Sequence, residues 1–457
     1  MEKENKMGIM PIKKLVMTMS LPIMISMLVQ SLYNIVDSIF VAKISEAALT
    51  ATSIAYSAQI LQIAVAVGTG VGVNALVSRM LGAKQADKVN EAATTGLVLT
   101  VLSSLIFVLW GIFGTKIFIQ QFTDNQEIMT MGTTYLQICQ IFSTGIFLGT
   151  LTQRLLQATG HTFSSMLAQL FGAFVNLVLD PILIFGLLGC PKMGIAGAAI
   201  ATVLGQWSAA IIGFILNYVQ NKEVHFVFRH FHMDKESVIQ IYKVGAPTIL
   251  TQAFGSLMVA AMNAILVMFS STAVAFFGVY FKLQSFLFMP MNGLGQGALP
   301  IVGYNFGSKN GQRVQQTYRC VCMFAIIFAL VGTLIFMICP ELLLTLFSAS
   351  SQMMTIGVPA LRIICVSFVF ASLTMVIGYM ISGLGNGLVN MIATALRQLV
   401  VLLPCVLLLG KVGGIQVVWF AFWISEICAF LFAGYCLKKE MSKKIKPLLS
   451  DQSHDVI

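Results

Sequence analysis

Twelve long runs of mostly apolar residues decide what this chain of 457 residues can fold into. A helix needs roughly 20 apolar residues to cross a bilayer, and the runs have about that length. They lack the strict alternation of apolar and polar residues that marks barrel strands. We therefore predict an all-α integral membrane protein with twelve transmembrane helices. The runs lie near residues 15–40, 50–78, 92–113, 131–151, 165–188, 195–219, 238–268, 273–301, 318–339, 357–381, 388–410 and 414–437.

The basic residues are distributed unevenly between the loops that join these runs. Of the 27 Lys and Arg residues, four fall on one side of the membrane, three fall within runs, and the other twenty share the opposite side. Cytoplasmic loops carry the excess of Lys and Arg, so both termini are predicted to be cytoplasmic. The net charge of +10 then reflects topology, and we expect no nucleic-acid partner. The four outer residues are Lys43, Lys116, Lys192 and Lys411, and the three within runs are Lys282, Arg362 and Arg397.

No catalytic or nucleotide-binding motif accompanies the runs. There is no G-x-x-x-x-G-K-[ST] loop, and the glycines of "VGTGVGVN" lie inside an apolar run, which predicts close helix packing. Most of the five histidines lie in loops or tails, including His225, His230 and His232, and predict neither a catalytic set nor a metal site. The nine cysteines contain no C-x-x-C pair and read as small hydrophobic residues. We expect no enzyme, no metal and no cofactor.

The second half of the chain repeats landmarks of the first at a constant offset. The landmarks are Pro22 and Pro247, Gly82 and Gly307, and Gly160 and Gly385, and the members of each pair differ by 225 in residue number. Each half holds six runs, an even number, so the two copies have the same orientation across the membrane. We predict two pseudo-symmetric six-helix lobes, 15–219 and 238–437, joined by a cytoplasmic loop, 220–237. Residues 1–14 and the basic segment 438–457 are predicted as cytoplasmic tails.

Only three of the 17 acidic residues lie within apolar runs, namely Asp37, Asp180 and Glu426. A charge there costs roughly 2.5–3.5 kcal/mol, so such residues usually have a function. Glu426 has two readings, a second-lobe site or a structural ion pair. Its partner in the second reading is one of the three cationic residues within runs.

Each of the two aspartates has an amide side chain on the same helix face. Asn34 precedes Asp37 by three residues, and Asn176 precedes Asp180 by four. The first and fifth helices run in the same direction, which places both carboxylates at similar depth, and Pro181 is expected to weaken the fifth helix locally. We predict one pocket in which the carboxylates bind and release a proton or cation. The structural alternative is a carboxylate that merely bonds to a neighbouring helix.

Several motifs in order resemble those of bacterial MATE (multidrug and toxic compound extrusion) proteins. They are "YNIVDSIFVAKISEAALTATS", "SRMLGAKQADKVNEA", "QATGHT", "NLVLDPILIFG", "GIAGAAIATVLGQ" and "GYNFGSKN". The resemblance implies an antiporter of the bacterial cytoplasmic membrane that works as a monomer in the lipid bilayer. It would export small lipophilic or cationic compounds by alternating access of two lobes, driven by protons or sodium.

The resemblance also implies a first-lobe ion site. It carries over to Asp37, Asn176, Asp180 and Thr202, with Tyr135 as a weaker match. Some members add carboxylates on the seventh and tenth helices, which this sequence lacks. That difference favours proton coupling and leaves sodium as an alternative.

Two other functions remain open from the sequence. A flippase for lipid-linked oligosaccharide, from the same superfamily, would need a strongly cationic cavity, whereas only three cationic residues lie within runs. An ion channel would show repeated pore loops or rings of charge, which are not evident.

Overall fold

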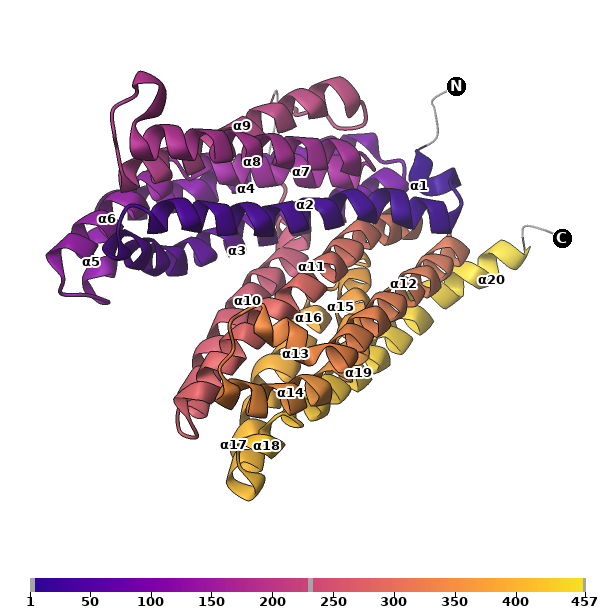
Figure 1. Ribbon diagram of the computed structural model, residues 1–457. Helices are drawn as coiled ribbons and strands as arrows, with labels where there is room; N and C mark the ends of the chain where they lie inside the picture. The colour runs from indigo at the N-terminus through magenta and orange to yellow at the C-terminus, as the bar shows by residue number, and fades with distance from the viewer. Residues whose placement is uncertain (1–4, 229–232, 455–457) are drawn as a thin grey trace. The chain divides into compact units, whose positions relative to one another are not determined.

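The computed structural model describes residues 5–228 and 233–454, with side chains up to Ser450, and the regular structure of this part is helical (Figure 1). Arg229, His230 and His232 lie outside the described residues. The first half contains α1 (Lys6–Ile9), α2 (Ile12–Ala42), α3 (Glu46–Gly82), α4 (Ala86–Phe113), α5 (Thr115–Gln120), α6 (Gln126–Ile141), α7 (Thr144–Ala158), α8 (Thr162–Phe185), the short η1 (Leu187–Gly189) and α9 (Ile195–Gln220).

The second half has the same order of long and short helices. It contains α10 (Lys235–Leu266), α11 (Ser271–Gly307), α12 (Gly311–Ile338), α13 (Pro340–Thr345), α14 (Ser351–Cys365), α15 (Phe368–Gly383), α16 (Leu388–Ala395), η2 (Leu396–Val400), α17 (Leu402–Gly413), α18 (Ile415–Val418), α19 (Ala421–Glu440), η3 (Met441–Ile445) and α20 (Lys446–His454). The segments η2 and η3 are π-helical.

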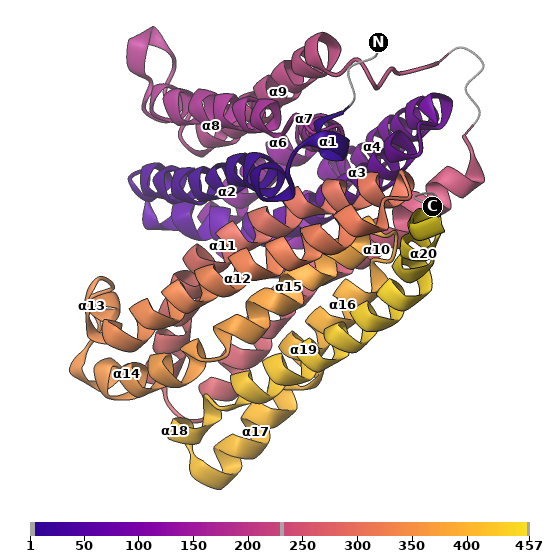
Figure 2. The ribbon, with the colours of Figure 1, turned by 90° about the vertical axis from the view of Figure 1, so that its right-hand side faces the viewer.

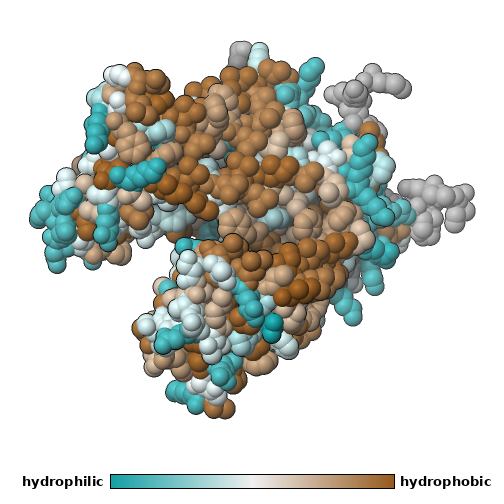
Figure 3. Space-filling view, in the orientation of Figure 1, coloured by the Kyte–Doolittle hydropathy of each residue, from teal (hydrophilic) through white to brown (hydrophobic). Residues whose placement is uncertain are grey.

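The chain is a multi-pass membrane protein. In the described residues, ten helical segments are long and apolar enough to cross a bilayer, and α14 with α15 forms an eleventh that bends by 50°. The starts of α6 and α7 match those of α14 and α15 at the repeat offset to within a single position, so α6 and α7 are the first-half copy of that bent span and complete twelve. Apolar side chains cover the middles of the helices and polar ones gather toward their ends (Figure 3). The predicted twelve-helix architecture of two repeated lobes is confirmed.

Backbone conformation repeats together with the helices. Lys84 and Lys309, which the repeat offset relates, have φ values of 56° and 57° where α3 and α11 end. Left-handed backbone is uncommon for residues other than glycine, so its recurrence at matched positions is informative. Gly160 and Gly385 repeat the pattern with φ values of 95° and 85°. The two halves therefore share local turn geometry as well as helix order.

The contacts divide the chain into two compact units. The N-unit contains Ile25–Ile249, and the C-unit contains the described residues up to Met24 and from Leu250 onward. Both boundaries fall inside a helix, α2 or α10, two residues after Pro22 or Pro247. The predicted lobes are 15–219 and 238–437. In the structure the first turns of α2 belong instead to the C-unit, and the first turns of α10 belong to the N-unit.

In each unit, two glycines four residues apart on one helix contact these exchanged turns. In the N-unit, a Cβ atom on Gly68 of α3 would lie 2.7 Å from the carbonyl oxygen of Gly245 on α10, and one on Gly72 would clash with the carbonyl of Ile241. Glycines four residues apart let two helix backbones approach closely. The packing role predicted for "VGTGVGVN" is confirmed.

The C-unit contains the matching seat at the same repeat offset. A Cβ atom on Gly293 of α11 would lie 2.7 Å from Met24 Cα, and one on Gly297 would lie 2.7 Å from Ser20 Cα. Ser20 also donates a hydrogen bond from Oγ to the Leu294 carbonyl at 3.3 Å. Each unit thus holds the start of one exchanged helix through backbone contact.

The segments predicted as tails and inter-lobe loop have defined places. In the C-unit, Arg313 donates to the carbonyls of Met7 and Met10 at 3.0 and 2.7 Å, which holds α1 in place. The backbone N–H of His225 donates to Asn90 Oδ1 at 2.7 Å, so the described part of the loop lies against α4. The segment predicted as a basic tail from residue 438 continues as helix to His454.

The glycine seat generates a stability prediction. Gly72→Ala should place a methyl group against the Ile241 carbonyl and lower stability by about 1–3 kcal/mol, as overpacking does elsewhere. The midpoint of thermal unfolding in detergent measures the effect. Gly255→Ala on α10, where an added Cβ meets nothing within 4 Å, is the matched control and should unfold at or slightly above the wild-type midpoint, because Ala favours the helix. Equal midpoints for both variants would contradict the packing role of Gly72.

Candidate functional site

Two carboxylates from separate helices meet inside the N-unit. Asp37 lies near the end of α2 and Asp180 lies on α8, and their side chains are within hydrogen-bonding reach of each other. Asp180 is fully buried and Asp37 is half-buried. The sequence predicted this meeting from the similar depth of the two residues.

One buried oxygen atom of each carboxylate has no hydrogen-bond donor in the described part of the chain. Among the described residues, no N–H or O–H group hydrogen-bonds to the buried atoms Asp37 Oδ1 and Asp180 Oδ2. Unpaired buried carboxylate oxygens are costly, and a proton or a cation removes that cost. The pair is therefore suited to binding a positive charge that arrives and leaves.

Helix α8 brings an amide to the same place. Asn176 Nδ2 donates to Asp180 Oδ1 at a long 3.4 Å, and both side chains are buried. Pro181 has no N–H to offer the carbonyl of Leu177, which weakens the helix next to the carboxylate. Gly205 of α9 lets α8 approach closely, since a Cβ atom there would lie 2.9 Å from Asn176 Cβ.

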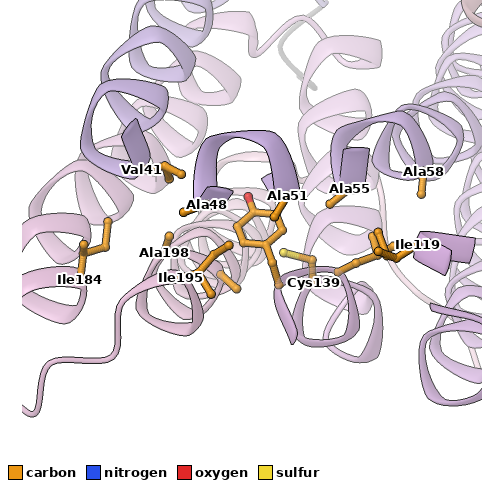
Figure 4. Packing of buried hydrophobic residues seen from close by; sticks show 13 residues of the cluster. Val41, Ala48, Ala51, Ala55, Ala58, Ile119, Cys139, Ile184, Ile195 and Ala198 are labelled. Atoms are coloured by element: carbon orange, nitrogen blue, oxygen red, sulfur yellow. The ribbon is translucent and has the colours of Figure 1, made fainter. Parts of the chain in front are cut away.

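A row of polar side chains extends the site toward α3. Tyr135 and Cys139 lie one turn apart on α6, with Tyr135 close to Thr202 on α9 and Cys139 close to Gln59 on α3. Figure 4 shows Cys139 facing the alanines of α3 in the buried cluster. Tyr135 is nearly buried, with 5% of its surface exposed. Of the residues carried over from the resemblance, Thr202 and Tyr135 thus lie together.

Cys139 and Gln59 are not among the predicted site residues, and one predicted residue, Asn34, stands apart. In the sequence Cys139 looks like a small hydrophobic residue, and the available signal is that it follows Tyr135 by four residues on one helix face. Asn34 was predicted beside Asp37, but its side chain is exposed. Among the described residues, no hydrogen bond joins the Asn34 amide to either carboxylate.

The third intramembrane carboxylate has a fixed partner in the C-unit. Glu426 of α19 forms an ion pair with Arg397, with Nε and Oε1 3.4 Å apart, and both side chains are largely buried. Lys282 and Arg362, the other two candidate partners, are exposed. Of the two readings for Glu426, the geometry is that of a structural ion pair.

A local break in the helix carries Arg397 to this position. Arg397 lies in the π-helical turn η2, where the N–H of Val401 bonds to the Leu396 carbonyl, five residues back, at 3.0 Å. Pro404 follows and cannot donate to the carbonyl of Val400, so the regular α pattern is already interrupted there. The π-turn rotates the residues that precede it relative to those that follow.

Sequence comparison finds similar proteins along nearly the whole chain. The protein-family model MatE matches residues 22–182 and 247–407, two segments whose starts and ends are separated by the repeat offset. The Multidrug export protein MepA of Staphylococcus haemolyticus (strain JCSC1435) is 26% identical over 435 residues, covering 94% of this chain and 94% of that protein. The second match to the family model coincides with the repeat found in the sequence.

Solved structures share the fold. One is described as the outward-facing conformation of a multidrug resistance MATE family transporter of the MOP superfamily; it has a TM-score of 0.90 and 24% identity, covering 97% of this chain and 99% of that one. Another, a MOP superfamily transporter from Pyrococcus furiosus Vc1 (DSM3638), is described by a reverse polarity of its binding pocket that suggests a different function. It has a TM-score of 0.88 and 23% identity, covering 96% and 98% of the two chains.

The ion pair generates a prediction about stability. Arg397→Met leaves Glu426 buried without a counter-charge and should cost about 3–5 kcal/mol, measured as a lower midpoint of thermal unfolding. The double variant Arg397→Met with Glu426→Gln removes both charges and should recover most of that loss. If the double variant is as unstable as the single one, the charge pairing does not account for the effect.

Proposed function

The chain belongs to the MatE family, and we propose that it is a secondary antiporter that exports small lipophilic, cationic compounds in exchange for protons. The observation that carries this proposal is the pair Asp37 and Asp180, which meets inside the N-unit with one buried oxygen on each residue lacking a donor. Such a pair can bind a proton at one stage of a transport cycle and a substrate cation at another.

The proposed mechanism rests on competition for one negative site. An uncompensated charge in a membrane costs roughly 2.5–3.5 kcal/mol, so the pair must be neutralised by a proton or by a cation. With access from outside, a proton neutralises Asp37 or Asp180, α2 rearranges, and the substrate cation loses its attraction and leaves. With access from inside, the proton leaves and substrate binds again. Asn176 and Thr202 stabilise the charged form between these events, and the exposed amide of Asn34 would join them only if α2 rearranges.

Protons are the proposed coupling ion, and no other cofactor is required. In the apolar runs of the second half, 238–268 to 414–437, the one carboxylate is Glu426, and Arg397 already neutralises it. A second cation site in that half is therefore not supported by a free negative charge. Sodium at Asp37 and Asp180 is the alternative, because carboxylate and amide oxygens also suit a hard cation.

The proposed substrates are cationic because the site that attracts them is acidic. The named relative, a multidrug export protein, supports a small-molecule cargo of this kind. A lipid-linked oligosaccharide would require a cationic cavity, and Arg397 is unavailable for one since it pairs with Glu426. We further propose that the protein lies in the bacterial cytoplasmic membrane, that both termini are cytoplasmic and that it functions as a monomer.

Neutralising either aspartate tests the proposed site. Asp37→Asn and Asp180→Asn should each slow substrate export by about tenfold or more, in line with coupling free energies of about 1–3 kcal/mol between two sites, and should abolish its response to a pH gradient. Export from membrane vesicles is the measurement. Asp124→Asn in the loop after α5, an exposed carboxylate, is the control and should export as wild type does. Wild-type rate and pH response in Asp37→Asn would refute the assignment.

Separate gradients identify the coupling ion. In proteoliposomes, substrate uptake should be driven by a pH gradient alone and not by a sodium gradient alone. Uptake driven by sodium alone would assign sodium to the same pair and leave the antiport proposal standing. Ion conductance that persists without substrate would instead indicate a channel and overturn it.

A further inference from the structure

The last long helix, α19, has a buried face and an exposed face. Ala429, Ala433 and Leu437 are buried on one side, in or beside a core cluster with α15 and α16. On the opposite side, Leu431 is 64% exposed and Tyr435 is 67% exposed. Because α19 belongs to a membrane span, the exposed apolar face is the one that meets lipid.

The exposed face becomes basic where α19 ends. Lys438, Lys439 and Lys443 follow Tyr435 at three, four and eight residues, so they continue the same face of the helix. With Tyr435 and Ser442 they line an open surface pocket of about 410 Å³. We call this surface the lysine face, meaning Tyr435, Lys438, Lys439, Ser442 and Lys443.

The neighbouring acid, Glu440, forms its ion pair with Lys444, which is not part of the lysine face. The ion pair spans 2.8 Å, and Glu440 also accepts a hydrogen bond from Asn386 Nδ2 at 2.8 Å. Lys444 also donates to the carbonyl of Leu384 at 3.1 Å, which fastens the π-turn η3 to the end of α15. In the described part of the chain, no carboxylate lies within ion-pair distance of Lys438, Lys439 or Lys443.

The repeat shows that this surface is particular to the second half. At the repeat offset, Lys438, Lys439 and Lys443 correspond to positions of α9 that carry no charge: Gly213, Phe214 and Tyr218. In that helix Asn217 is buried and donates to the carbonyls of Gly213 and Thr152. The lysines are therefore not required by the shared fold.

We propose that the lysine face binds the headgroup of an anionic phospholipid. Acyl chains would lie along the apolar face that contains Leu431, Tyr435 would sit at the level of the headgroups, and the three lysines would hold the phosphate. Clusters of Lys beside the cytoplasmic end of a span attract anionic lipids in this way. Three lysine charges beside a pocket and a continuous apolar stripe provide complementarity to both parts of such a lipid.

The bound lipid stabilises the end of the chain. In two views α19 and α20 form one continuous rod (Figures 1 and 2). A Cβ atom on Gly311, at the start of α12, would lie 3.2 Å from both the Ile445 carbonyl oxygen and Leu448 Cβ, so α20 packs against α12. A lipid that holds the lysine face thus adds to the contacts that hold α20 on the C-unit.

The test compares lipids and variants on the purified full chain. Phosphatidylglycerol should raise the midpoint of thermal unfolding and remain bound in native mass spectra, whereas phosphatidylcholine and inorganic phosphate should do neither. The triple variant Lys438→Gln, Lys439→Gln and Lys443→Gln should weaken phosphatidylglycerol binding at least about tenfold. The milder Lys439→Gln should weaken it about fivefold and keeps the test valid if the triple variant fails to fold.

A matched control separates a site from general surface charge. Lys13→Gln, Lys14→Gln and Lys222→Gln remove three exposed lysines elsewhere and should leave phosphatidylglycerol binding unchanged. Equal losses in the two triple variants would overturn the proposal. An effect of inorganic phosphate equal to that of phosphatidylglycerol would also overturn it, since the site would then recognise a free anion.

Discussion

Hydrocarbon cannot solvate a charge, and this constraint governs where every ionisable residue of the protein can lie. Of 17 acidic residues, three remain within the apolar spans, and the structure treats them in two ways. Glu426 has a permanent counter-charge in Arg397. Asp37 and Asp180 have each other and leave buried oxygens without donors. Glu426 Oε2 also lacks a hydrogen-bond donor among the described residues, so the two arrangements differ in charge: Arg397 compensates Glu426, whereas Asp37 and Asp180 face each other with like charges.

The internal repeat shows which features the fold requires and which it merely carries. Gly68 and Gly293 recur because helix backbones touch there and any side chain would separate them. The charges do not recur, since Asp37 corresponds to Met262 and Glu426 to Ala201. Packing geometry has therefore been kept in both halves, whereas polar chemistry differs between them. A charged residue can be replaced if its partner is replaced at the same time. A glycine at a backbone contact cannot, because any side chain there would push the two helices apart.

The sequence predicted the parts of this structure that depend on periodicity and membrane cost. Helix number follows from span length, the repeat offset from matched Pro and Gly residues, and the meeting of Asp37 with Asp180 from their similar depth along each helix. The exchange of the first turns of α2 and α10 could not be predicted, because a sequence repeat shows which residues correspond and not which helices pack together. Cys139 was missed because a cysteine in an apolar run looks the same whether it packs in the core or lies beside a polar site. Asn34 stands apart because a three-residue spacing fixes a helix face only approximately.

The distribution of fixed and exchangeable charge suggests where ion binding acts. In the C-unit, α19 is held at its middle by the pair of Glu426 with Arg397, and at its end by Glu440 and Lys444. These contacts are made between residues of the chain and need no ion from solution. In the N-unit, the carboxylate contact proposed to bind a proton joins α2 to α8, next to a proline that weakens α8. A change of protonation would alter the free energy of that contact, so we expect the ion-driven rearrangement to begin at α2 and α8.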